Sequence, residues 1–98
     1  MKTLPADVKP YKRTPEFTRE STPPGLLKAH NTKDGVWARI VVLEGSMTYR
    51  ILEPGIEEIA LDSQRFGVIE PRVLHEVVPN EGVRFYVEFC RADDAGSG

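Results

Sequence analysis

The sequence contains a single cysteine, Cys90, among 98 residues. One cysteine excludes an internal disulfide and a cysteine-rich zinc site. The lysines and arginines form no basic run and the formal net charge is −2, so neither nucleic acid nor an anionic membrane is expected as a partner. The sequence also lacks an uncharged stretch long enough to cross a bilayer, and its first twenty residues are too charged for a signal peptide. These absences favour a cytoplasmic protein.

Helical periodicity of useful length is missing as well. Turn signals instead recur about every eight to twelve residues, which is typical of an all-β sandwich or barrel. One domain is expected for this length, and it divides into an extended proline-rich arm (residues 1–24), a β-barrel (residues 25–91) and a disordered tail (residues 92–98). The expected strands cover residues 26–30, 37–43, 46–52, 57–61 and 83–90, with a further strand that opens at His75.

The chain is organised around residues 67–80, GVIEPRVLHEVVPN. A short apolar run leads to Pro71, and the strand that opens with His75 follows. A histidine at this place can point into the mouth of a barrel while its neighbours pack the wall. The stretch therefore predicts a site at the open end of the barrel.

Two histidines and one glutamate are candidates for a metal site. His30 and His75 are the two histidines of the chain, and neutral imidazole is the commonest ligand of transition metals. Glu88 lies in the middle of an expected strand, where a carboxylate is costly unless it is paired or bound to a metal. The alternatives are that backbone carbonyls satisfy both histidines and that Glu88 faces solvent.

Arg39 and Tyr49 are candidates for binding a ligand or cofactor beside that site. Arg39 interrupts the most apolar strand, and a buried arginine needs a carboxylate such as Glu88 or a bound anion. Tyr49 shares a strand face with Met47 and Ile51 and could point its hydroxyl into the pocket. The alternatives are a structural ion pair for Arg39 and plain core packing for Tyr49.

The glycine, proline and histidine spacing of residues 67–80 resembles the second motif of the cupins, which are small double-stranded β-helix (jelly-roll) barrels. Gly45, in VVLEGSMTYR, fits the glycine of the first cupin motif. More narrowly, the sequence is similar to the small cupin family that includes YeaR and the N-terminal domain of tellurite resistance protein B. The stretches that carry this resemblance are TPPGLLKAHNTKDGVWARI, VVLEGSMTYRI, VIEPRVLHEVVP and VRFYVEF. The resemblance implies an all-β, single-domain cupin barrel.

The first cupin motif is incomplete in this sequence. It usually supplies two histidines and a glutamate, whereas here Thr32 stands at the place of the second histidine and the glutamate position falls near Val36 or Trp37. A four-ligand iron or manganese dioxygenase site is therefore not expected. Longer members of the family carry a methyltransferase domain, but this sequence has no glycine-rich nucleotide-binding turn, so methyl transfer from S-adenosylmethionine is not expected of it either.

Three functions are open from the sequence. The first is a divalent-metal- and small-ligand-binding domain in which His30, His75 and Glu88 hold zinc, or iron or another first-row metal. The resemblance adds a role in tolerance of tellurite, of a related oxyanion or of nitrosative stress. The second is a non-haem oxygenase-like enzyme with the same ligands, so whether the chain is an enzyme is left open. The third is a metal-free binding or dimerisation module. The expected partners are a small molecule or small anion and a second copy of the chain, as a homodimer.

Overall fold

The computed structural model describes residues 1–27 and 30–92, with His30 and Asn31 described by their backbone. The regular secondary structure of this part of the chain is almost all β-strand, which confirms the all-β prediction. The one helix among these residues has four residues, and none of the described helical structure is long and apolar enough to cross a membrane. In chain order the elements are β1 (Val8–Arg13), β2 (Phe17–Thr18), α1 (Pro24–Leu27), β3 (His30–Asn31), β4 (Trp37–Glu44), β5 (Ser46–Ile51), β6 (Glu57–Asp62), β7 (Gly67–Ile69), β8 (Leu74–Pro79) and β9 (Arg84–Ala92).

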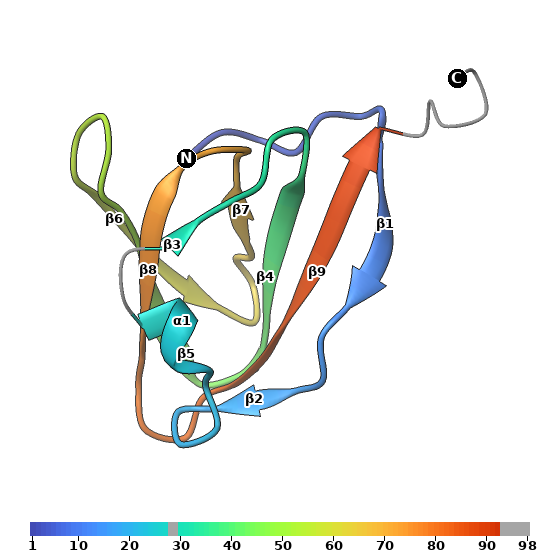
Figure 1. The fold of residues 1–98 in the computed structure, drawn as a ribbon. Helices are drawn as coiled ribbons and strands as arrows, with labels where there is room; N and C mark the ends of the chain where they lie inside the picture. Colours follow the sequence, from blue (N-terminus) through green and yellow to red (C-terminus); the bar gives the residue numbers. More distant parts are fainter. Residues whose placement is uncertain (28–29, 93–98) are drawn as a thin grey trace.

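The strands form two antiparallel sheets that face each other (Figure 1). The five-stranded sheet has the order β1-β9-β4-β7, and β2 also pairs with β9. The four-stranded sheet has the order β3-β8-β5-β6. Strands that follow one another in the chain mostly lie in different sheets, so most strand pairing joins distant parts of the sequence.

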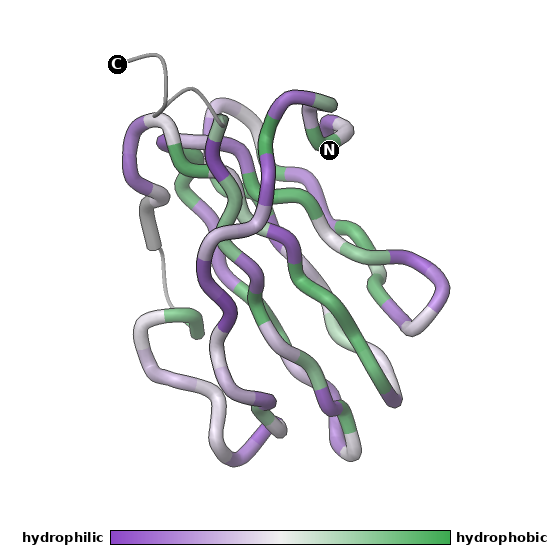
Figure 2. The backbone as a smooth tube through the Cα atoms, turned by 90° about the vertical axis from the view of Figure 1, so that its right-hand side faces the viewer, coloured by the Kyte–Doolittle hydropathy of each residue, from purple (hydrophilic) through white to green (hydrophobic). Residues whose placement is uncertain are grey.

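One hydrophobic core fills the space between the sheets. Along the strands, hydrophobic residues alternate with hydrophilic ones (Figure 2), because successive side chains of a strand point to opposite faces. In β5 the buried residues are Met47, Tyr49 and Ile51, as the alternation predicts. The core cluster contains Ala38, Ile40, Val42, Met47, Tyr49, Ile51, Ile59, Leu61, Ile69, Val77, Val83, Phe85 and Val87.

The strand predicted for residues 26–30 is wrong. Pro24–Leu27 form the single helical turn α1 instead, and strand β3 begins at His30. Proline is favoured at the first position of a helix because its φ is fixed near the helical value and its missing N–H is not needed there. The backbone N–H of Leu26 donates to the carbonyl of Pro23 at 2.9 Å, which closes the turn.

The N-terminal segment belongs to the five-stranded sheet over part of its length. Strand β1 pairs with β9 from Val8, opposite Ala92, to Arg13, opposite Glu88. Strand β2 pairs with the other end of β9. The division of the chain into an arm, a barrel and a tail stays a prediction, and residues 93–98 of the predicted tail lie outside the described residues.

Candidate functional site

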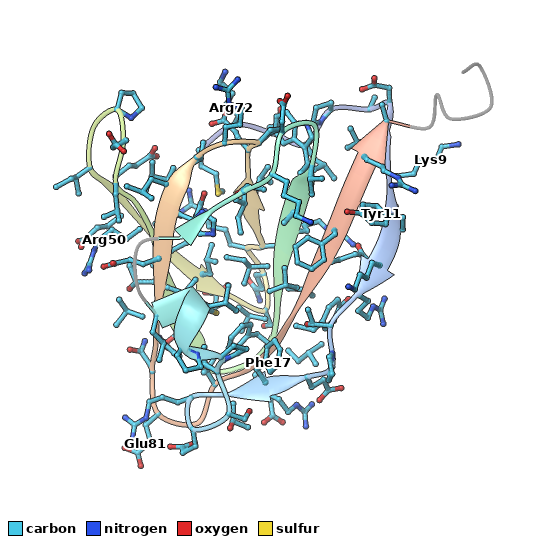
Figure 3. All side chains as sticks on the ribbon, in the orientation of Figure 1. Lys9, Tyr11, Phe17, Arg50, Arg72 and Glu81 are labelled. Atoms are coloured by element: carbon cyan, nitrogen blue, oxygen red, sulfur yellow. The ribbon has the colours of Figure 1, made fainter. Side chains whose placement is uncertain are left out.

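A pocket of about 440 Å³ opens between the two sheets, and we call it the inter-sheet pocket. Strands β1, β2, β4, β7 and β9 contribute to it on one side, and β8, α1 and the loop after β3 close the other side. Most of its surface is hydrocarbon, from side chains that include Phe17, Leu26, Ile69, Val87 and Phe89. Figure 3 labels two of the lining residues, Tyr11 on β1 and Phe17 on β2. The pocket is therefore mainly apolar, with a few polar groups set into it.

His75 is the most buried polar residue of the pocket, with 2% of its surface exposed. Its ring Nδ1 lies 2.9 Å from the carbonyl oxygen of Val73. Because a carbonyl can only accept, Nδ1 carries a proton and donates, and in a neutral ring the Nε2 atom is then an acceptor. The ring also packs edge-on against Tyr49, with 5.9 Å between the ring centres. These two contacts fix the orientation of the imidazole.

Thr32 is the second buried polar residue of the pocket. Its carbonyl oxygen accepts a hydrogen bond from the backbone N–H of Arg72 at 2.9 Å, which ties the loop after β3 to the turn before β8. Arg72 has a φ of 63°, in the left-handed region that residues other than glycine seldom adopt. The Oγ1 of Thr32 is buried and has no hydrogen-bond partner among the described residues.

The pocket also has two lysines and no carboxylate among its described lining residues. Lys12 and Lys33 lie at its surface, and both side chains are exposed. Besides Tyr11 and Thr32, Thr14 also brings a hydroxyl to the lining. This hydroxyl is already satisfied, because its Oγ1 accepts from the Val87 N–H and donates to the Pro15 carbonyl, each at 2.9 Å. The electrostatic character of the pocket is therefore positive at the rim and nearly neutral inside.

Strand pairing places the backbones of the two histidines side by side. His30 and His75 are directly opposite each other in the antiparallel pair of β3 and β8. The side chain of His30 lies outside the described part of the chain. These positions are forty-five residues apart, and the sequence alone left open whether they would meet. The pairing of β3 with β8 shows that their backbones do.

The side chain of Glu88 lies on the outer face of the five-stranded sheet, whereas His75 lies in the other sheet and lines the pocket on the inner side. Val87, the neighbour of Glu88, lines the pocket, and the alternation of strand β9 therefore turns the Glu88 side chain outward. There its Oε1 accepts a hydrogen bond from Arg39 at 2.6 Å, and its Oε2 lies 3.4 Å from Nη2 of Arg13. Two guanidinium groups, rather than a metal ion, explain the burial of this carboxylate.

The prediction of a divalent metal cofactor is wrong. Among the described side chains, those of residues 1–27 and 32–92, there is no group of three His, Cys, Asp or Glu residues that could hold a metal ion. The predicted ligands His75 and Glu88 are separated by a sheet, so they cannot share one ion. The alternation of the strand already places Glu88 on the face opposite Phe85 and Val87, but it does not show which of the two faces carries the pocket.

Arg39 and Tyr49 do not line the inter-sheet pocket. Arg39 forms the ion pair with Glu88 that the sequence offered as the alternative, and its guanidinium lies 5.2 Å from the ring centre of Phe66. Tyr49 is fully buried in the core, and its hydroxyl has no hydrogen-bond partner among the residues described. Burial, together with the Glu70 and Glu57 carboxylates, raises the pKa of Tyr49 well above its ordinary value.

Sequence reasoning missed Thr32, Lys12 and Lys33 as pocket residues. Thr32 stands where the cupin pattern has its second histidine, a position that marks a missing metal ligand and gives no sign of a hydroxyl for ligand binding. Lys12 and Lys33 carry no local signal, because the pairing of β1 with β9 and the path of the loop after β3 bring them to the same opening.

Comparison with known proteins identifies the family. A model of the TehB-like domain matches residues 12–87. The probable S-adenosyl-L-methionine-dependent methyltransferase TehB of Haemophilus influenzae strain Rd is 32% identical over 71 residues, which is 68% of this chain and 25% of that protein. The TehB of a second strain of the same species, 10810, matches equally well. This chain thus spans about a quarter of the curated relatives it matches.

Two crystal structures share the fold. A structural-genomics structure of an Escherichia coli K12 protein superposes with a TM-score of 0.85 at 22% identity, covering 94% of this chain and 98% of that one. The structure of TehB from Haemophilus influenzae superposes with a TM-score of 0.84 at 24% identity, covering 94% of this chain and 34% of that one. At these identities the likeness shows the fold alone.

These matches correct the functional prediction. The relatives are named as methyltransferases that depend on S-adenosylmethionine, so the predicted cupin-type metal-binding function is wrong, and the oxygenase-like alternative, which needs the same metal, falls with it. The narrower assignment to a YeaR-type cupin family is not supported, whereas its tellurite resistance protein B part is confirmed. The chain belongs to the TehB-like domain family.

Proposed function

We propose that this chain serves methyl-transfer chemistry of the TehB type, linked to tolerance of tellurite or a related oxyanion, by holding the small-molecule substrate or product. The observation that carries the proposal is the inter-sheet pocket, most of whose lining residues fall within residues 12–87, the part of the chain that matches the family. Its volume of about 440 Å³ lies in the range of small-molecule sites, roughly 300–1,000 Å³.

The methyl donor itself does not fit the residues of this pocket. S-Adenosylmethionine carries a positive sulfonium centre and a ribose diol, and carboxylates are the side chains that usually hold ribose hydroxyls. The described lining has lysines at the rim and no carboxylate, which disfavours a cation. The strand pairs of the described residues are also all antiparallel, unlike the parallel strand–helix–strand units of dinucleotide sites. We therefore propose that the pocket holds the molecule that is methylated, or its methylated product, rather than the methyl donor.

We further propose that the two sheets form a jelly-roll barrel of the cupin type. Eight-stranded jelly rolls place strands alternately in two sheets through two Greek keys. The alternation of β3, β4 and β5, and again of β7, β8 and β9, between the sheets supports this topology. Such a barrel would explain why the pocket opens between the two sheets.

Binding measured by NMR on the isotope-labelled full chain tests the proposed function. We expect sodium tellurite or methylseleninate to shift the amide signals of Thr32 and His75, and S-adenosylmethionine to leave them unchanged. Val36→Phe, which places a ring at the pocket wall, should abolish the shifts. Ala60→Phe, on the exposed face of β6, is the matched control and should keep them. No shift with either anion, or a pocket filled by S-adenosylmethionine, would overturn the proposal.

The predicted homodimer remains a proposal of its own. On the outer face of β4 the apolar side chains of Trp37, Val41 and Leu43 are only half buried, which leaves room for a second copy of the chain. Sedimentation velocity of the purified protein over a range of concentrations tests this directly, and a monomer at every concentration would contradict it.

A further inference from the structure

The inter-sheet pocket combines an apolar wall with a positive rim, and this combination restricts the class of ligand that it suits. Five of its wall residues, Phe17, Leu26, Ile69, Val87 and Phe89, are hydrocarbon side chains from both sides of the opening. A bare oxyanion buries no apolar surface against such a wall and loses part of its hydration on entering it, so it should bind more weakly than an anion with an apolar body. The wall instead favours a ligand with an apolar body, since burial of apolar surface is favourable by roughly 25 cal/mol per Å².

The rim favours a negative charge on that ligand. Lys12 and Lys33 carry the charges at the opening, and neither forms an ion pair with another described residue. The described lining has no carboxylate to repel an anion or to attract a cation. Because both lysines are exposed, the attraction is screened and modest, so it selects between ligands more than it supplies affinity.

Thr32 provides a place for a polar group of the ligand. It is 9% exposed, and its Oγ1 is buried without a hydrogen-bond partner among the described residues. A buried hydroxyl without a partner is unfavourable. Because Thr32 lines the inter-sheet pocket, a ligand oxygen there could accept a hydrogen bond from this hydroxyl once the side chain turns toward it. A ligand that reaches Thr32 therefore removes an existing cost.

From these three features we infer that the inter-sheet pocket binds a small organic monoanion, with its apolar body on the hydrocarbon wall, a hydrogen bond to Thr32 and its charge within reach of Lys12 and Lys33. The inference rests on the proposed function in taking this pocket as the small-molecule site. Two sources share the chemistry: a partly methylated chalcogen oxyanion, which has a methyl group beside charged oxygens, and a short-chain carboxylate.

Calorimetric titration of the full chain with five probes tests the inference: methylseleninate, hexanoate, hexanol, hexylammonium and sodium tellurite. We expect hexanoate to bind about tenfold more tightly than hexanol, and hexylammonium to bind least. The tighter of methylseleninate and hexanoate identifies the source. Equal binding of hexanoate and hexanol, or binding of tellurite alone, would overturn the inference while the proposed function stands. Absence of binding by every probe would overturn both.

Matched variants separate the contributions of the residues. Lys12→Met with Lys33→Met should remove most of the preference for hexanoate over hexanol, whereas Lys2→Met with Lys9→Met, which removes the same charge away from the pocket lining, should leave the preference intact. Thr32→Val should weaken hexanoate about five- to tenfold, and Thr32→Ser, which keeps a hydroxyl, should restore it. Far-UV circular dichroism checks that each variant is folded. Unchanged affinity in Thr32→Val would exclude the threonine from the site.

Discussion

Nη2 of Arg39 donates a hydrogen bond to Oε1 of Glu88 at 2.6 Å, between residues that are directly opposite each other on β4 and β9. Glu88 is 5% exposed, and Arg13 approaches the second oxygen of its carboxylate from β1. One buried carboxylate thus links three neighbouring strands of the five-stranded sheet on its outer face. This linkage explains why a charged residue, Arg39, lies in the most apolar strand of the chain. It requires no role for Arg39 or Glu88 in the inter-sheet pocket.

Arg39→Met should destabilise the protein by about 1–3 kcal/mol, because it leaves Glu88 buried with only the longer contact to Arg13. Arg39→Met combined with Glu88→Gln should recover much of this loss, since no uncompensated charge remains. Arg19→Met, which breaks the exposed pair with Glu20, is the control and should change stability by less than about 1 kcal/mol. Urea unfolding measures all three. Equal stability of Arg39→Met and wild type would show that the pair is not stabilising.

The alternation of residues along single strands predicted which side chains share a face. The pairing of the strands decided which face carries the pocket. Met47, Tyr49 and Ile51 face the core because side chains of a strand repeat with a period of two, which depends on neighbouring residues alone. The same rule placed Glu88 opposite Phe85. It could not say that the face of Phe85 is also the face of the pocket, because that depends on the register of β9 with β1 and β4. The metal hypothesis failed at this step.

The pocket could not be predicted because its lining is assembled from distant segments. Tyr11 and Phe89 both line it although almost the whole chain separates them, and β1 and β9 meet only through long-range pairing. The helical turn α1 was missed for a different reason. Residues 26–30 are apolar enough for a strand, but Pro24 sets the backbone at the start of a helical turn.

The raised pKa of Tyr49 makes stability depend on pH above about 10. Below the ordinary tyrosine pKa of about 10 both the folded and the unfolded state keep the proton, so Tyr49 has no effect on the pH dependence. Above it the unfolded state ionises while the folded state does not, because burial and two nearby carboxylates raise the folded pKa. The unfolded state then binds fewer protons, and stability falls as pH rises, by up to about 1.4 kcal/mol per pH unit.

Tyr49→Phe should therefore lose less stability between pH 9.5 and 11.5, roughly, than the wild type does. Tyr11→Phe, which alters an exposed tyrosine, is the control and should keep the wild-type dependence. Urea unfolding at a series of pH values measures the slopes. Identical slopes for wild type and Tyr49→Phe would contradict the buried phenol.

Divalent metals should leave the thermal stability unchanged. Glu88 faces away from His75, so the predicted three-residue ligand set cannot form around one ion. We expect millimolar zinc or iron(II), and treatment with EDTA, to shift the melting temperature by less than about 1 °C. A site with micromolar affinity would instead raise it by about 15 °C or more at that concentration. A rise of that size, lost in His75→Ala, would reinstate a metal site.

Gly45 and Gly35 allow the cost of backbone conformation to be separated from the cost of crowding. Both have a positive φ, 74° and 77°, in the left-handed region that is unfavourable for residues with a Cβ. At Gly35 a Cβ would meet nothing within 4 Å, whereas at Gly45 it would lie 2.9 Å from the Cα of Val83, in the turn before β9. Backbone atoms cannot move aside as a flexible side chain can.

Gly35→Ala should therefore destabilise by about 1–2 kcal/mol, the cost of the left-handed conformation alone. Gly45→Ala should cost this amount and, in addition, the displacement of the β9 turn, so we expect at least about 1 kcal/mol more. Urea unfolding gives both values. The amide signals of Val83 and Gly82 should shift in Gly45→Ala and stay in place in Gly35→Ala. Equal losses of stability would mean that Gly45 is needed only for its φ, and that the close approach of the β4–β5 and β8–β9 turns relaxes without cost.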